Sequence, residues 1–286
     1  MAETSATAAA ATPAKPSELR ETILFLVKLA IAVLIFRSFI LAPFSIPSQS
    51  MLPRLYIGDY LFVSKWSYGY SRWSLPYGWP LIPGRVLGST PDRGDVVVFR
   101  GPPDLDGKTH DVIKRVIGLP GDSVQMRGGQ LILNGKLIPK QQVGDFVLPL
   151  TPNYPAGREC PSQFQDSANG VPVCRYQQFR ETLPSGRSYL VLDRGERPDA
   201  DDTGVYSVPA GSVFVMGDNR DDSGDSRFAA PADAQPGQAE GMGFVPMERL
   251  EGKALVGFWS TDGNASWWNP VSWFTATRWN RIGEGF

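Results

Sequence analysis

Residues 111–122 read DVIKRVIGLPGD, an apolar run that contains two cations and closes with a Leu-Pro-Gly turn. β-Branched and apolar residues in this arrangement are typical of a buried strand. Successive side chains of a strand point to opposite faces, so Lys114 is predicted to point inward and Arg115 outward. Burial disfavours a charged ammonium group and lowers its pKa from about 10.4 toward about 7 to 8. A neutral Lys114 could therefore take a proton from a nucleophile.

A candidate nucleophile lies upstream, where residues 44–53 read FSIPSQSMLP and contain Ser50. The only histidine is His110, so a Ser-His-Asp triad would depend on that one ring. We expect His110 to be a solvated polar residue. Taken alone, Ser50 is better explained as a turn serine between two prolines, but together with the Lys114 strand it predicts a serine nucleophile with a lysine base.

Residues 217–227 read GDNRDDSGDSR and form a loop by composition. A calcium site is the first alternative for such an acidic loop. The spacing fails, because an EF-hand counted from Asp218 would place Arg220 at the third position and Ser223 at the sixth, where glycine is required. The sequence therefore predicts a loop that supports another site.

Composition bounds the fold and excludes several classes of function. Hydrophobic residues make up 42% of the chain, and 30 glycines and 25 prolines separate short β-rich runs, which predicts a mainly β body with many turns. A net charge of −1 with mixed signs lacks the basic face of nucleic-acid binders. One histidine and two cysteines are too few for an ordinary zinc site. We expect no metal, no cofactor and no nucleic-acid partner.

The N-terminal part predicts a membrane anchor. Residues 1–21 begin with an Ala-, Thr- and Pro-rich stretch, which is typical of a disordered tail. Residues 22–42 are apolar over about one bilayer crossing, and Lys28 and Arg37 lie near enough to the ends to snorkel. The alternatives are a cleaved signal peptide and a buried core helix. An uncleaved anchor is preferred because no small-x-small site follows and the run is longer than an ordinary signal core.

Two aromatic stretches and one cysteine pair remain. Residues 68–79 and 266–274, with Trp279 beyond them, are rich in Trp and Tyr, which suits either a membrane interface or a core; for the second stretch we expect the interface. Cys160 and Cys174 have no competing cysteine. Outside the cytoplasm a disulfide is expected, contributing about 3 kcal/mol in the chain-entropy model, and two free thiols are the alternative.

Four stretches in order carry a family resemblance: SQSMLP (residues 48–53), RGDVVVF (93–99), IKRVIGLPGD (113–122) and GDNRDDSGDSR (217–227). Through them the chain closely resembles bacterial type I signal peptidase, a membrane-anchored Ser-Lys protease. The resemblance implies one transmembrane helix (22–42) in the inner membrane, a cytoplasmic N-terminus and a periplasmic catalytic β domain. It divides that domain into residues 43–122 and 206–286, with a smaller β region inserted at 123–205.

The resemblance also implies roles for individual residues. Ser50 would be the nucleophile and Lys114 the general base, while the Ser48 hydroxyl and the Ser50 N–H would stabilise the oxyanion. Ser223 would hydrogen-bond and orient Lys114, and Asp225 would pair with Arg227 to hold the loop. Small residues at the first and third positions before the cleaved bond would fit pockets walled by Phe44, Ile46, Pro47, Met51, Leu55, Val112 and Ile113. Gln49 departs from the glycine that members often have there.

The expected partners are preproteins with signal peptides, membrane lipids and the secretion translocon. Two alternatives share features with this prediction. Other Ser-Lys β proteases, such as pilin-processing enzymes and self-cleaving SOS repressors, use the same chemistry, although the anchor and the lack of a DNA-binding module disfavour repressors. An inert β domain that binds exported peptides would tolerate alanine at Ser50 and Lys114. The Ser-x-x-Lys and Gly-x-Ser-x-Gly motifs of other serine enzymes are absent.

Overall fold

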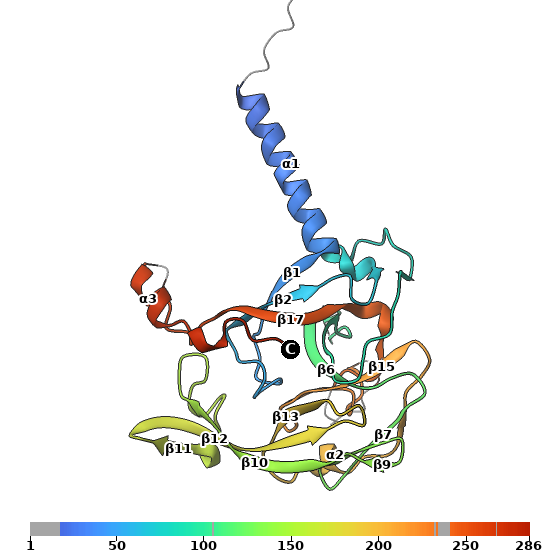
Figure 1. Ribbon diagram of the computed structural model, residues 1–286, viewed down its shortest axis with the longest axis vertical. Coiled ribbons are helices and arrows are strands. Elements are labelled where there is room, and N and C mark those ends of the chain that lie inside the picture. The colour runs from blue at the N-terminus through green and yellow to red at the C-terminus, as the bar shows by residue number, and fades with distance from the viewer. Residues whose placement is uncertain (1–17, 105, 232, 234–240, 267) are drawn as a thin grey trace, which may run out of the picture.

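The computed structural model describes residues 18–104, 106–231, 233, 241–266 and 268–286. Helix α1 (Glu18–Phe39) extends away from a mainly β body, as Figure 1 shows. It begins and ends a few residues earlier than the predicted span of 22–42, and residues 1–17 of the predicted tail lie outside the described part. With a mean hydropathy of 2.2 and mostly exposed side chains, the helix is apolar enough to cross a membrane. Its 22 residues span roughly 33 Å, enough for the hydrocarbon core of about 30 Å.

The body contains one large sheet that carries Lys114 on one of its strands. Within the described residues its strand order is β1 (Leu41–Ser45), β2 (Asp59–Ser64), β17 (Leu250–Ser260), β5 (Val96–Arg100), β6 (Asp111–Gly118), β15 (Ser212–Met216) and β16 (Val245–Pro246). Every pairing in it is antiparallel. Residues far apart in sequence, from both ends of the chain, therefore meet in one sheet.

The centre of this sheet is buried on both faces, which explains its unbroken apolar strands. In β5, Val96 and Val98 pack into a cluster that includes Met51. Val97 and Phe99 face a second cluster on the other side. Side chains alternate across a strand, so a run of four apolar residues indicates a strand covered on both sides.

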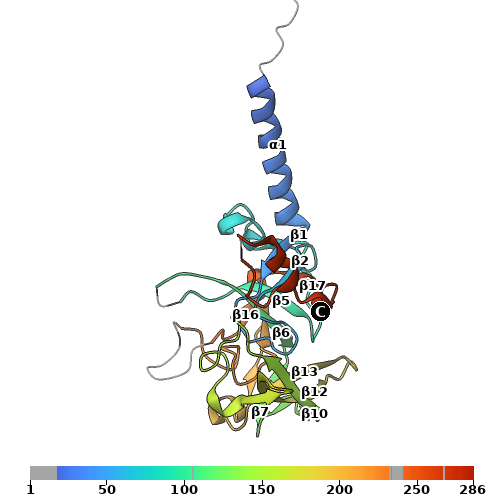
Figure 2. The ribbon, with the colours of Figure 1, turned by 90° about the vertical axis from the view of Figure 1, so that its left-hand side faces the viewer.

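Residues 123–207 form two smaller sheets below the main one. The first contains β10 (Lys140–Pro149), β12 (Val171–Thr182) and β11 (Gln165–Ala168), with β13 (Ser188–Asp193) paired to β12. The second contains β14 (Tyr206–Ser207), β7 (Ser123–Arg127), β8 (Gln130–Leu133) and β9 (Lys136–Leu137). Figures 1 and 2 both show these strands at the end of the body opposite α1. The mainly β fold with an inserted β region is thus confirmed.

The other described elements are short: β3 (Tyr70–Ser71) paired with β4 (Arg85–Val86), helices α2 (Pro198–Asp201) and α3 (Pro270–Thr275), and 3-10 helices at Arg72–Ser74, Pro76–Gly78, Ser162–Phe164, Met247–Arg249 and Trp279–Arg281. The first aromatic stretch is divided, since Tyr68 is buried whereas Tyr77 is exposed. In the second stretch Trp267 lies outside the described residues, and Trp268 and Phe274 are exposed.

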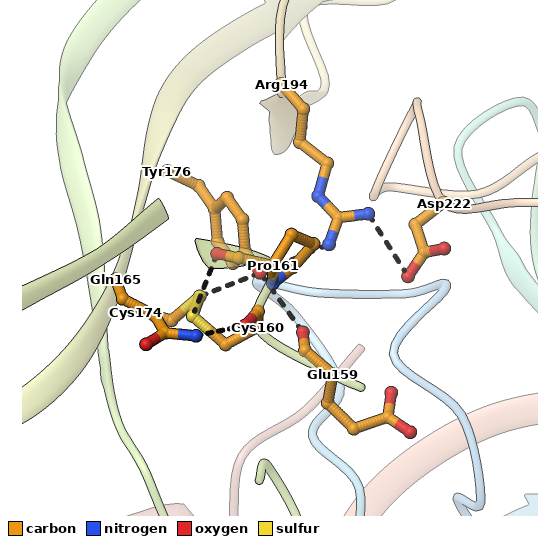
Figure 3. The surroundings of a disulfide bond; sticks show 8 residues. All are labelled: Glu159, Cys160, Pro161, Gln165, Cys174, Tyr176, Arg194 and Asp222. Carbon is orange, nitrogen blue, oxygen red and sulfur yellow. Dashed lines mark hydrogen bonds and ion pairs between the residues drawn. A yellow bond between two sulfur atoms is a disulfide. The ribbon is translucent and has the colours of Figure 1, made fainter. Parts of the chain in front are cut away.

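Cys160 and Cys174 form the disulfide expected from the sequence, with their Cα atoms 5.8 Å apart (Figure 3). Cys174 lies on β12, and Cys160 precedes the 3-10 helix at Ser162–Phe164. Both belong to an apolar cluster that also contains Leu52, two residues after Ser50. The disulfide region therefore packs directly against the segment that carries the candidate nucleophile.

Candidate active site

Strand β6 brings Lys114 to Ser50. The Lys114 ammonium nitrogen lies 2.7 Å from Ser50 Oγ and 3.1 Å from the Ile113 carbonyl oxygen. Both side chains are buried, with 4% of Lys114 and 7% of Ser50 exposed. The two residues are 64 positions apart in sequence, so only the sheet brings them into hydrogen-bonding contact.

Burial controls the protonation of Lys114. Loss of solvation is the largest effect and lowers the pKa of Lys114 from 10.5 to about 8. Three carboxylates of the 217–227 loop act in the opposite direction and favour the charged form: Asp225, Asp218 and Asp222. A substantial fraction of Lys114 is consequently neutral at mildly alkaline pH, and a neutral amine can accept a proton.

The 217–227 loop holds the backbone around Ser50. The Asn219 N–H donates to the Ser50 carbonyl oxygen at 3.1 Å, and the Asn219 side-chain amide donates to the Gln49 carbonyl oxygen at 3.1 Å. Gly217 lies against the same segment, because a Cβ there would overlap the Ser50 carbonyl oxygen and the Ser223 hydroxyl. The sequence predicted only that the 217–227 loop supports another site. The Gly-Asp-Asn-Arg motif was visible in the sequence, but its contact with Ser50 was not.

Ser48 and Ser223 flank the pair differently. The Ser48 and Ser50 hydroxyl oxygens are 3.3 Å apart. The Ser223 hydroxyl is buried but has no hydrogen-bond partner within the described chain, so the expected bond to Lys114 is not formed in this structure. The reason is local: Ser223 packs its Oγ against Gly217, while the Lys114 ammonium donates to Ser50 and Ile113 instead.

Asp225 and Arg227 form a completely buried ion pair inside the loop. Arg227 Nε lies 2.9 Å from Asp225 Oδ1, and both side chains are 0% exposed. Asp225 also accepts the Gly217 N–H at 3.0 Å. Burial alone would raise the pKa of Asp225, but the Arg227 charge and hydrogen bonds outweigh it and hold the pKa below its ordinary value. The pair therefore fixes Gly217 at the position where the loop contacts Ser50.

Asp225→Asn is expected to lower the free energy of unfolding by about 3 to 5 kcal/mol, because it leaves the Arg227 guanidinium buried without a counter-charge. Urea unfolding of the detergent-solubilised protein measures this change. The matched control is Asp166→Asn, which removes an exposed carboxylate 2.7 Å from Arg175 and should change the free energy by about 1 kcal/mol or less. Equal, small effects of both substitutions would contradict the structural role of the Asp225–Arg227 pair.

Arg115 corrects the prediction that it points to solvent. Only 4% of Arg115 is exposed, and its guanidinium makes two hydrogen bonds to the Asp218 carboxylate, at 2.7 and 2.6 Å. The guanidinium carbon lies over the Tyr189 ring, 4.5 Å from the ring centroid. The prediction failed because β6 is covered on both faces, which periodicity along one strand cannot reveal.

A cavity of about 740 Å³ is lined by residues of the end of α1, of β1 and of the start of β6. Neither Ser50 nor Lys114 belongs to its lining, which reaches the sequence neighbour Ile113 of Lys114 and Pro47 in the nucleophile segment. Its lining includes five of the seven residues predicted to form pocket walls, namely Phe44, Ile46, Pro47, Val112 and Ile113. The other two, Met51 and Leu55, are 0% exposed and belong to the apolar cluster behind the wall.

His110 and metal-binding groups add nothing to this pair. The His110 side chain is 71% exposed and lies 3.5 Å from Asp104. Among the residues described, no three His, Cys, Asp or Glu side chains converge in a way that could hold a metal ion.

Comparisons with known proteins identify relatives of this chain. The family model described as "Signal peptidase, peptidase S26" matches residues 19–259. Signal peptidase I of Rickettsia typhi is 36% identical over 244 residues, which cover 82% of this chain and 78% of the relative. Signal peptidase I of Rickettsia massiliae is 34% identical over 277 residues, covering 90% and 89%.

A crystal structure of signal peptidase I from Enterococcus faecalis is 25% identical and covers 58% of this chain and 97% of its own, with a TM-score of 0.26, too low for a comparison of the folds. The family model's match, residues 19–259, spans all four motifs, and the Rickettsia relatives extend over most of the chain. The resemblance found in the motifs is confirmed: the chain belongs to the signal peptidase family, peptidase S26.

Proposed function

We propose that the chain removes signal peptides from exported preproteins, with Ser50 as nucleophile and Lys114 as general base. The observation that carries the proposal is the 2.7 Å contact between their side chains in a buried site. Neutral Lys114 takes the Ser50 proton while Oγ attacks the scissile carbonyl carbon, and the resulting ammonium protonates the leaving amine. A water molecule then gives a proton to Lys114 as its oxygen attacks the acyl carbon, and Lys114 returns that proton to Ser50 Oγ as the acyl–oxygen bond breaks.

The developing oxyanion needs donors that are already in place. We assign this role to the Ser50 N–H and the Ser48 hydroxyl, supported by the 3.3 Å separation of the two serine oxygens. Ser223 keeps the proposed role of orienting Lys114, because its hydroxyl is buried, unpartnered in the described chain and packed against Gly217 beside the Ser50 carbonyl. Asp225 and Arg227 support the loop and do not react.

The proposed substrate is an extended segment with small residues at the first and third positions before the cut. Strand β1 is the terminal strand of the main sheet, and it lines the cavity together with residues 110–113 at the start of β6. A peptide can add to such an edge as a further strand. Alternate side chains of that peptide point the same way, so the first and third residues would face one wall, made by Phe44, Ile46 and Ile113. A narrow apolar wall rejects large side chains by overlap.

We place the catalytic body on the periplasmic side of the inner membrane, with α1 as its anchor. The Cys160–Cys174 disulfide supports this placement, because disulfides persist in oxidising compartments. Exposed Phe274 and Trp279 support contact of the tail with lipid. Contact with the translocon follows from the same position. We also propose the division into residues 43–122 and 206–286, with 123–205 inserted.

The test is cleavage of a preprotein with an Ala-x-Ala site by the full chain in detergent, with the new N-terminus sequenced. Cleavage after the second alanine is expected. Leucine in place of either alanine should slow cleavage by at least about 10²-fold, because it would overlap the wall. Leucine at the middle position is the matched control and should be cut at nearly the original rate. Equal tolerance at all three positions would contradict the proposed specificity.

A further inference from the structure

The loop that holds Ser50 is itself held by the inserted β region. The Leu192 N–H of β13 donates to the Asp218 carbonyl oxygen at 2.8 Å, and the Arg220 N–H donates to the Leu192 carbonyl oxygen at 3.0 Å. These two bonds enclose Asn219, whose backbone N–H donates to the Ser50 carbonyl oxygen. Strand β13 and the nucleophile segment are thus connected through a single residue.

A buried ion pair strengthens this connection. Arg220 donates to both carboxylate oxygens of Glu181 on β12, at 2.7 and 2.5 Å, and the two side chains are 3% and 1% exposed. The Tyr189 hydroxyl of β13 donates to the same carboxylate at 2.9 Å. Two hydrogen bonds in a fixed plane restrain the direction of Arg220 as well as its distance.

Arg194, near the disulfide, makes a second contact with the loop. Figure 3 shows Arg194 between Tyr176 and Asp222, next to the Cys160–Cys174 bridge. Its guanidinium lies 3.5 Å from the Asp222 carboxylate and donates to the Tyr176 hydroxyl at 3.1 Å. Asp222 directly precedes Ser223. The inserted region therefore contacts the loop at Asp218, Arg220 and Asp222.

We propose that Glu181 is a positioning residue for the nucleophile, acting through Arg220 and Asn219 on the Ser50 backbone. Glu181 lies outside every stretch that carries the family resemblance, and its carboxylate binds Arg220 and Tyr189 rather than Ser50 or Lys114. The Asn219 side-chain amide donates to the Gln49 carbonyl oxygen, which shares a planar peptide group with the Ser50 N–H. The inserted region would thereby set the orientation of that N–H, which the proposed function uses as an oxyanion donor. The inference rests on that proposed function.

A shift of the Asn219–Ser50 contact should reduce turnover more than substrate binding. The oxyanion forms only as the reaction proceeds, whereas the apolar cavity wall binds the substrate beforehand. A displacement of about 1 Å in a catalytic group can lower the rate by about 10²-fold. Loss of the Glu181 carboxylate should therefore appear in kcat, with KM nearly unchanged.

The first test is Glu181→Gln in the full chain in detergent, with Asp166→Asn as the matched control from the same β region. Glu181→Gln is expected to lower kcat by about 10- to 100-fold while KM changes by less than about threefold. Asp166→Asn removes an exposed carboxylate and should keep both constants. The folded fraction of each variant is measured by thermal unfolding, so that kcat refers to folded protein.

A second variant distinguishes the effect of a displaced loop from the effect of an unpaired charge on Arg220. Glu181→Gln/Arg220→Gln removes the pair without leaving a buried charge, so it carries the test if the single variant fails to fold. If the loop moves away, Lys114 loses the field of Asp225, Asp218 and Asp222 that favours its protonated form. The acid limb of kcat/KM should then move to lower pH by about half a unit or more in the double variant.

Lower kcat in both variants, together with a displaced acid limb, supports the positioning role. Wild-type kcat and an unshifted acid limb in the folded double variant overturn it. Failure of the proposed function looks different, because cleavage by Ser50→Ala would then persist whatever the Glu181 variants do.

Discussion

Ser50→Ala is expected to reduce kcat/KM for preprotein cleavage by at least about 10⁴-fold. Without Oγ no acyl-enzyme can form, and Lys114 has no hydroxyl proton to remove. Since Ser50 is 7% exposed and its hydroxyl contacts Lys114 and Ser48, the alanine side chain fits the same space without overlap. The loss should therefore occur with little change in the thermal midpoint of unfolding, and a rate assay combined with thermal unfolding measures both quantities.

Two further serine substitutions serve as comparisons for Ser50→Ala. Ser48→Ala should reduce kcat by about 10- to 100-fold, because it removes one of the two proposed oxyanion donors and leaves the nucleophile. Ser167→Ala on β11 changes an exposed hydroxyl in the inserted region and should leave the rate unchanged. Cleavage by Ser50→Ala at more than about 1% of the wild-type rate would refute the nucleophile assignment, and it would favour another nucleophile.

Lys114→Met is expected to reduce kcat by about 10³-fold or more, because it removes the general base from a site where no other base contacts Ser50 Oγ among the described residues. Lys114→Arg should be equally inactive, since a guanidinium stays protonated at every accessible pH. Lys136→Met on β9 changes an exposed lysine and serves as the control. Activity of Lys114→Arg near the wild-type level would exclude Lys114 as the base.

The pH dependence of the wild-type enzyme follows from the same residue. Only neutral Lys114 accepts a proton, and burial lowers its pKa to about 8. Below that pH, kcat/KM should fall about tenfold per unit as the amine becomes protonated, and above it the rate should level off. Steady-state rates between pH 6 and about 10 measure this limb. A profile without an acid limb near 8 would show that the rate is governed by another group.

Local patterns in the sequence predicted the anchor, the β body and the catalytic pair. The apolar run of residues 22–42 indicated one spanning helix, and the structure shifts its bounds only slightly, to Glu18–Phe39. Lys114 was recognisable because a lysine on the inward face of an apolar β run has few structural reasons to be there. The cysteine pairing needed only the count of two and an oxidising compartment.

Three features could not be predicted because they depend on which elements pack together. Arg115 is buried against Asp218 rather than exposed, because a further layer covers β6. The Ser223 hydroxyl lies against Gly217 and makes no hydrogen bond to Lys114. The Arg220–Glu181 pair joins the catalytic loop to a region without any recognisable motif. Each involves partners separated by many residues or a choice among rotamers.

The sequence by itself determined the kinds of element and the residue types available for chemistry. Helix length, strand alternation and the position of Lys114 within an apolar run are properties of short stretches. The tertiary structure alone decided which atoms meet. These contacts are the 2.7 Å contact of Lys114 with Ser50, the hydrogen bond from the Asn219 N–H to the Ser50 carbonyl oxygen, and the pair formed by Arg220 and Glu181. The physical reason is that propensity and periodicity act over a few residues, whereas burial and hydrogen-bond geometry arise only when distant strands pack into one sheet.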